Sequence, residues 1–177
     1  MASPDPDLAA WTRRLRHEAP IDLSLADVDA LDRDALDSSV GFAAEHARRY
    51  VASGGTDDGR DGLRPIVILY TTGRTSGRTR RVPLLCHELN GKRYVMASKG
   101  GSTSHPEWYL NLVANAAVHV RMDDRVYAAT ARTLDGDERG RVWRHLIAAH
   151  PRYADYQQST TRQIPIVHLA DLCPIDQ

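Results

Sequence analysis

The sequence predicts an α+β protein built on an antiparallel sheet or barrel. Its 177 residues suit a single domain, because domains commonly hold roughly 100–200 residues. Segments with strand character follow one another between residues 64 and 169, mostly through short turns, without the regular alternation with helices that a doubly wound sheet requires. We expect about six mostly antiparallel strands with peripheral helices. Residues 38–177 form the expected domain, and residues 1–37 form a partly helical extension.

The strand segments are recognised by their apolar spacing and their turns. Residues 66–70 form an unbroken, largely β-branched run, which is typical of a strand covered on both faces. Alternation over residues 81–87 predicts a second strand. Asn90 and Gly91 then signal a two-residue hairpin turn into a partner strand at 93–98. The remaining strands are expected at residues 118–122, 126–133 and 164–169.

Helical spacing is found in fewer segments. An apolar repeat with interleaved arginines predicts a short helix with a basic face over residues 8–16. Residues 22–37 give no clear pattern. Ser38 or Ser39 is expected to cap a helix that runs to about residue 51. Two further helices are expected over residues 105–114 and from a capping box at 135–138 to the helix-ending Pro151.

The net charge is zero, but charge is unevenly distributed along the chain. Residues 1–61 carry a net charge of −6, residues 62–106 carry +7, and the remainder carries −1. A basic block inside a neutral protein indicates a local anion site rather than a general nucleic-acid surface. We therefore expect no nucleic-acid partner. Nucleic-acid binding would be recognised by an affinity that falls steeply as the salt concentration rises.

Composition also bounds the cellular setting. No run of 18 apolar residues occurs, so no transmembrane helix is expected. The N-terminus lacks the pattern of a secretory signal, which favours a cytoplasmic protein, and the basic helix at 8–16 would allow contact with a membrane surface. Cys86 and Cys173 form no CxxC or zinc spacing and are expected to be reduced, packed thiols.

Several common catalytic motifs are absent. The sequence holds no GxGxxG, no phosphate loop ending in Gly-Lys-Ser/Thr and no HExxH, and its eight histidines show no ligand spacing. It also lacks a nucleophile elbow and a Ser-x-x-Lys pair. Hydrolase and metalloenzyme functions are therefore disfavoured, and no metal site is expected.

Two stretches have the chemistry of an anion site. Residues 73–81 hold four arginines, three hydroxyl side chains and two glycines. Guanidinium groups bind phosphate or carboxylate through paired hydrogen bonds, although a solvated basic turn explains the same residues about equally well. In the second stretch, Lys99 and two glycines can form a nest of backbone amides, and Trp108 and Tyr109 can flank a flat ring. Core packing of these aromatics is the commoner outcome, by about two to one.

A third, weaker feature is the pair Tyr153 and Tyr156, which would share one face of a helical turn. Their hydroxyl groups can donate hydrogen bonds into a pocket, or the two rings can simply pack. The anion features at neighbouring strand ends indicate one long, partly aromatic polyanion as the ligand.

These stretches resemble the deazaflavin-dependent nitroreductase family of actinobacteria. The resemblance covers about residues 40–170 in colinear order, and the combined pattern is highly specific although each piece alone is not. The matching segments are TTGRTSG at 71–77, RRVPL at 80–84, ASKGG at 97–101, HPEWYLNL at 105–112, ATAR at 129–132, YADYQ at 153–157 and TRQIPI at 161–166.

The resemblance implies a split β-barrel like that of FMN-binding oxidases and the use of coenzyme F420, an 8-hydroxy-5-deazaflavin. It implies an oxidoreductase that transfers a hydride from reduced F420 to an electron-poor small molecule, namely a quinone, enone or nitro compound. An FMN-dependent oxidoreductase of the same fold and a non-catalytic deazaflavin-binding protein are the alternatives. A monomer or a homodimer is expected.

The resemblance also assigns residues to the site. Thr75 departs from the lysine that the family often has there, and Arg78 can supply the missing charge. The implied catalytic residues are Tyr153, Ser98 and Tyr156. The implied cofactor-binding residues are Arg74, Thr75, Ser76, Arg78, Arg80, Arg81, Val82, Pro83, Met96, Ala97, Ser98, Lys99, Gly100, Gly101, Trp108, Tyr109 and Asn111.

Overall fold

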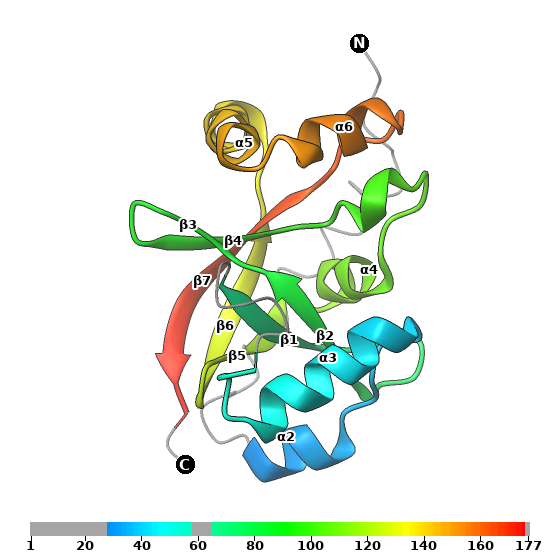
Figure 1. Cartoon of the computed structure of the whole chain (residues 1–177), viewed down its shortest axis with the longest axis vertical. Helices are drawn as coiled ribbons and strands as arrows, with labels where there is room; N and C mark the ends of the chain where they lie inside the picture. Colours follow the sequence, from blue (N-terminus) through cyan, green and yellow to red (C-terminus); the bar gives the residue numbers. More distant parts are fainter. Residues whose placement is uncertain (1–27, 58–64, 176–177) are drawn as a thin grey trace.

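A computed structural model describes residues 28–57 and 65–175, which form one curled antiparallel sheet with helices around it (Figure 1). In these residues the helices are α2 (Val28–Asp34), α3 (Gly41–Ala52), α4 (Glu107–Ala114), α5 (Gly136–Ala149) and α6 (Arg152–Gln158). The strands are β1 (Ile66–Thr72), β2 (Thr79–Leu85), β3 (His87–Leu89), β4 (Lys92–Met96), β5 (Ala117–Met122), β6 (Arg125–Thr133) and β7 (Ile166–Pro174). The strand order is β2-β1-β5-β6-β7-β4-β3.

The α+β class and the predicted strands are confirmed, with seven strands in place of about six. The expected strand over 81–87 divides into β2 and β3, because the chain changes its partner: residues up to Leu85 pair with β1, whereas His87 pairs with Tyr94 of β4. The hairpin turn between β3 and β4 is confirmed. Asn90 (φ 53°) and Gly91 (φ 71°) both adopt the left-handed conformation that this turn requires.

The helix predictions that fall on described residues are correct in position, but the two expected side-chain caps are not formed. Helix α3 begins at Gly41 after Val40, and neither Ser38 nor Ser39 caps it through a side chain. Asp135 precedes α5, but its carboxylate makes no cap hydrogen bond either. Helix α2 lies within residues 22–37, where no clear pattern predicts a helix. The helix expected over 8–16 lies outside the described residues, so its membrane contact stays a prediction.

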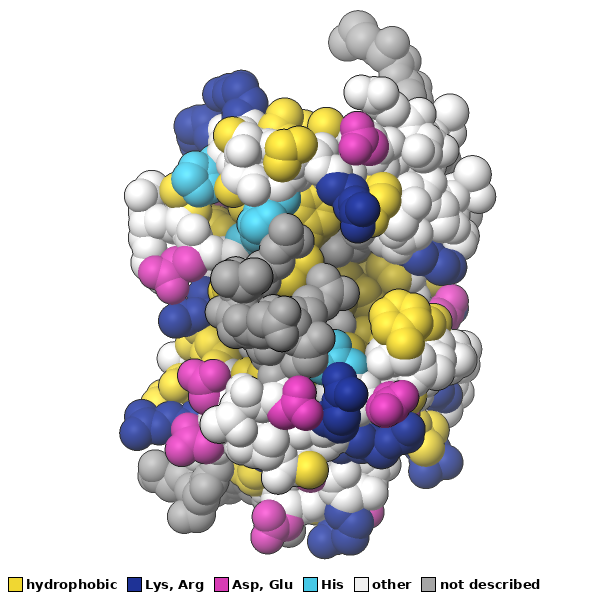
Figure 2. Space-filling view, viewed as in Figure 1, with side chains coloured by type: hydrophobic (Ala, Val, Ile, Leu, Met, Phe, Trp, Pro, Cys, Tyr) yellow, Lys and Arg dark blue, Asp and Glu magenta, His cyan; other side chains and the backbone are white. Residues whose placement is uncertain are grey.

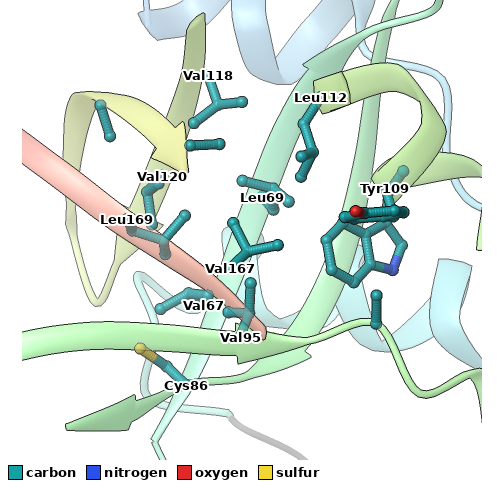
Figure 3. Close-up of a cluster of buried hydrophobic side chains, with 14 residues drawn as sticks. Val67, Leu69, Cys86, Val95, Tyr109, Leu112, Val118, Val120, Val167 and Leu169 are labelled. Carbon is teal, nitrogen blue, oxygen red and sulfur yellow. The ribbon is translucent and has the colours of Figure 1, made fainter. Parts of the chain in front are cut away.

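The main core lies between the curled strands and α4. Figure 3 shows Val67 and Leu69 of β1 facing Val167 and Leu169 of β7, while Leu112 approaches from α4. All five side chains are at most 2% exposed. The unbroken run predicted for β1 is explained by this position, because α3 covers the other face through Ala47 and Tyr50 packed on Ile66, Ile68 and Tyr70.

The two thiols differ in their surroundings. Cys86 is buried as expected, and burial raises the pKa of its thiol to about 11. Cys173 is exposed near the end of β7, so the expectation that it is packed is wrong. The sequence pattern missed this because β7 runs five residues beyond the predicted end of the strand at 169, and its final residues have little cover.

Buried ion pairs attach the segment before α3 to the sheet. The Asp32 carboxylate accepts hydrogen bonds from the Tyr70 hydroxyl and from the Arg121 guanidinium, whose side chain is 7% exposed. Burial, together with this carboxylate, raises the pKa of Tyr70 well above its usual range. Arg81 donates to the Asp37 carboxylate at 2.6 Å and to the Asp32 carbonyl at 3.2 Å. These contacts hold the segment between α2 and α3 against the first residues of β2.

We expect the Asp32→Ala substitution to lower the free energy of unfolding by about 3 kcal/mol, because it leaves the buried Arg121 guanidinium without its counter-charge. The matched control is Asp34→Ala, which removes an ion pair to Arg33 whose side chains are both 64% exposed, and which should cost less than about 1 kcal/mol. Urea unfolding followed by circular dichroism measures both. Equal losses would show that the buried pair does not hold this segment.

Candidate active site

A pocket of about 700 Å³ lies where the ends of β1, β2 and β4 meet α3, α4 and α6. Five stretches far apart in the sequence form its wall. They contribute residues within 37–43, 71–85, 96–100, 106–111 and 150–156. The first stretch was not predicted, and it reaches the pocket because the Asp37–Arg81 ion pair draws it against β2.

Three basic side chains, Arg74, Arg80 and Lys99, line the pocket from the segment between β1 and β2, from β2 and from the turn after β4, and this part of the wall is called the cationic end; Arg152 lines the pocket from α6. Arg74 donates to the Glu107 carboxylate at 2.6 Å, and Lys99 donates to the Ser104 hydroxyl at 2.8 Å. Arg80 differs from both, because its guanidinium makes no hydrogen bond or ion pair with any residue that the structure describes. Arg80 is therefore a cation that is available to an anionic ligand.

The turn after β4 brings this cationic end close to α6. Lys99, Gly100 and Gly101 adopt φ values of 46°, 61° and 83°, so three successive residues are left-handed. A Cβ atom on Gly101 would lie 2.9 Å from the carbonyl oxygen of Tyr156. Glycine is required at position 101 because the turn backbone passes so close to the helix that carries Tyr153 and Tyr156.

Arg162 fixes the same turn from behind. Its guanidinium donates to the carbonyl oxygens of Ala97 at 3.1 Å, Ser98 at 2.7 Å and Ser102 at 2.8 Å. Burial lowers the pKa of this group, a cost that the charged hydrogen bonds offset. Sequence reasoning gave Arg162 no role, although it lies within the matching segment TRQIPI.

The wall next to the cationic end is formed by α4. Trp108 and Tyr109 both pack in the main core, but only Trp108, which is 9% exposed, also lines the pocket. Asn111 is held at both ends of its amide. It donates to the Thr71 hydroxyl at 3.2 Å and accepts from the Arg74 backbone N–H at 3.1 Å.

The opposite wall carries hydroxyl and imidazole groups. The Tyr153 hydroxyl lies 2.9 Å from His87 Nε2, and the ring of Tyr156 lies 6.3 Å from that of Tyr153. The ring of His150 stands edge-on to His87, with 4.7 Å between ring centres. His150 lines the pocket and His87 lies behind Tyr153. Neither histidine was assigned to the site from the sequence.

Most of the residues assigned from the sequence meet in this pocket. Its described wall includes Arg74, Thr75, Arg80, Arg81, Val82, Pro83, Met96, Ser98, Lys99, Gly100, Trp108, Asn111, Tyr153 and Tyr156. Among the described residues, Ser76, Arg78, Ala97, Gly101 and Tyr109 do not line it. Arg81 lines the pocket, but its guanidinium is already paired with Asp37. Roles for individual residues stay predictions.

Charge and apolar groups are mixed on the visible surface. Figure 2 shows Lys and Arg side chains interspersed with Asp and Glu side chains, with hydrophobic and histidine side chains between them.

Among residues 28–57 and 65–175, no cluster of three or more His, Cys, Asp or Glu side chains is placed to hold a metal ion. No helix within these ranges is long and apolar enough to cross a membrane.

Comparison with known proteins identifies the family. A family model described as F420H(2)-dependent quinone reductase matches residues 43–171, which is more than half of the chain. The chain belongs to this family. An F420H(2)-dependent quinone reductase of Mycobacterium tuberculosis is 33% identical over 112 residues, covering 61% of this chain and 74% of that protein.

Two solved structures are also similar to this member of the F420H(2)-dependent quinone reductase family. An F420-H2 dependent reductase (FDR-A) is 48% identical, with a TM-score of 0.54 over 60% of this chain and 94% of its own. A structure described as a domain-swapped dimer is 44% identical, with a TM-score of 0.56 over 75% of this chain and 99% of its own. The split β-barrel is thereby confirmed, and the chain is an F420H2-dependent reductase whose coenzyme is F420.

We expect Arg162→Lys to lower the free energy of unfolding by about 2 kcal/mol, because one ammonium group cannot replace a planar fork that serves three carbonyl oxygens. The control is Arg144→Lys, an exposed arginine of α5. Urea unfolding measures both variants. An Arg162→Lys variant as stable as the control would show that these hydrogen bonds contribute nothing net.

Proposed function

We propose that this chain reduces a quinone with the hydride of reduced coenzyme F420. The observation that carries the proposal is that one pocket joins a cationic end to an aromatic and hydroxyl-bearing end. Membership of the F420H(2)-dependent quinone reductase family supports the choice of a quinone over an enone or a nitro compound. Apolar side chains in the wall, including Val40, Phe42 and Leu84, suit the carbon skeleton of such an acceptor.

The residues present fit the coenzyme. Its phosphate and glutamate tail is anionic, and Arg80 offers a guanidinium that no described residue occupies. Arg74 and Lys99 add positive charge at the same end. Arg74 is held by Glu107 and Asn111, and Lys99 by Ser104 and the carbonyl of His105. Arg81 neutralises Asp37 instead, so its contribution is to shape the wall.

The flat ring of the coenzyme suits the wall formed by Trp108 and Met96. Asn111 is already oriented by Thr71 and Arg74, so little entropy is lost when a ring edge meets it. When bound, the reduced coenzyme supplies a hydride from its C5 atom. The protein therefore has to hold the acceptor over that ring and exclude competing water.

Tyr153 is the residue best placed to assist the acceptor. Reduction of a quinone by hydride leaves negative charge on a carbonyl oxygen, which a hydroxyl donor stabilises and then protonates. Tyr153 lines the pocket, is 8% exposed and is held by His87. Ser98 and Tyr156 line the same region and serve as further donors to the acceptor.

The proposal is tested by titrating the purified protein with F420 and with FMN, followed by turnover of F420H2 with menadione, a nitroimidazole and cyclohexenone. We expect F420 binding without FMN binding and fastest oxidation of F420H2 with the quinone. Faster turnover of the nitro compound or enone would reassign the acceptor. Binding of F420 without turnover of any acceptor would identify a carrier protein, and binding of FMN alone would reject the coenzyme.

We expect Arg80→Ala to weaken F420 binding by about 1.5–3 kcal/mol, or roughly 10- to 150-fold in Kd, because a charged hydrogen bond to the tail is lost. The matched control is Arg125→Ala at the exposed start of β6, which should leave Kd unchanged. Fluorescence titration measures both. An Arg80→Ala variant with the affinity of the control would remove Arg80 from the tail site.

A further inference from the structure

The charges of the pocket wall do not cancel. Five basic and two acidic side chains of the described residues line the pocket. The two carboxylates belong to Asp37 and Glu107, and each already accepts a hydrogen bond from an arginine, at 2.6 Å in both cases. The basic side chains that have no carboxylate partner in the described wall are Arg80, Lys99 and Arg152. The described wall therefore carries an excess of positive charge, which favours anionic ligands.

Arg152 is separated from the other two cations along the wall. It is the first residue of α6, whereas the turn after β4 meets this helix at Tyr156, whose Cα atom would lie 3.2 Å from a Cβ atom on Gly101. Four residues of α-helix span about 6 Å along the helix axis. The backbone of Arg152 therefore lies one helical turn away from the point where the cationic end meets α6.

The same helix carries the hydroxyl groups proposed to act on the acceptor. Tyr153 follows Arg152 directly and Tyr156 follows one turn later, and both line the pocket. Arg152 thus adds positive charge to the wall that faces the acceptor. The anionic tail of the coenzyme already has Arg80 and Lys99 at the other end.

No described residue occupies the Arg152 guanidinium. Arg152 is exposed, and it makes no hydrogen bond or ion pair with the part of the chain that the structure describes. Asp155 stands three residues further along α6, a spacing at which opposite charges can pair on a helix surface. The two do not pair, and Arg152 lines the pocket whereas Asp155 does not. The guanidinium is therefore available to a ligand in the pocket.

We propose that Arg152 is a specificity-determining residue that binds an anionic substituent of the acceptor, so that quinones bearing a carboxylate, a sulfonate or an ionised hydroxyl group are preferred. This inference rests on the proposed quinone reduction. A guanidinium binds a carboxylate or sulfonate through two parallel N–H donors. Because Arg152 is exposed, water screens the interaction, which selects among quinones without holding them tightly.

The kinetic test uses a naphthoquinone with a propionate side chain and the methyl ester of the same compound as acceptors for F420H2. The acid and the ester share one quinone ring and differ in charge, so the ratio of their kcat/KM values reports recognition of the anion. Arg152→Gln should lower the acid-to-ester ratio about 5-fold. Arg152→Glu should lower it further, because it replaces attraction by repulsion. Arg152→Lys should retain part of the preference.

The matched control is Arg144→Gln, which removes an exposed arginine of α5 outside the pocket wall and should leave the ratio unchanged. Added NaCl should lower the ratio in the wild type more than in Arg152→Gln. If Arg152→Gln slowed the acid and the ester equally, its role would be structural. If it weakened F420 binding without changing the ratio, Arg152 would belong to the tail site. Either result would overturn the inference.

A second readout needs no turnover. Naphthoate is an aromatic anion that accepts no hydride, and calorimetric titration into the protein loaded with oxidised F420 measures its Kd directly. We expect Kd to rise about 5-fold in Arg152→Gln and to stay unchanged in Arg144→Gln. Equal Kd values in the wild type and Arg152→Gln would reject the site. If naphthoate bound through Arg152 while neither quinone oxidised F420H2, the proposed quinone reduction would be wrong and the anion site would stand.

Discussion

The arginine fork at position 162 is the constraint on which the pocket depends. One guanidinium binds the carbonyls at the end of β4 and in the following turn, and so joins the segment that precedes β7 to the cationic end of the pocket. In the turn that Arg162 binds, Gly101 lies against the backbone of α6. The spacing between the cationic end of the pocket and the tyrosines is thereby set by a single, partly buried arginine rather than by the sheet alone.

Local chemistry made much of the fold predictable. The Asn90-Gly91 turn and the apolar run of β1 are determined by residues that are neighbours in the sequence, and both occur as expected. The N-terminal part of the described chain is different. The carboxylate of Asp32 meets partners 38 and 89 residues away in Tyr70 and Arg121, so no local pattern announces α2 or its position.

The site was predictable where chemistry is concentrated in short segments and not where it depends on tertiary contact. Arginines and glycines near β2 and the turn after β4 are conspicuous in the sequence. Trp108 and Tyr109, by contrast, both pack in the main core, and only the tertiary structure shows that Trp108 also lines the pocket. His87 gives no signal, since its partner Tyr153 is 66 residues away.

The two sides of the pocket wall differ in how much sequence change they tolerate. On the turn side, a side chain at Gly101 would collide with α6, so sequence change there is costly. On the α3 side, Phe42 is 74% exposed and a Cβ at Gly41 would meet nothing within 4 Å. Sequence change in the pocket wall is therefore accommodated most readily on the rim formed by α3, while the turn after β4 has little freedom to vary.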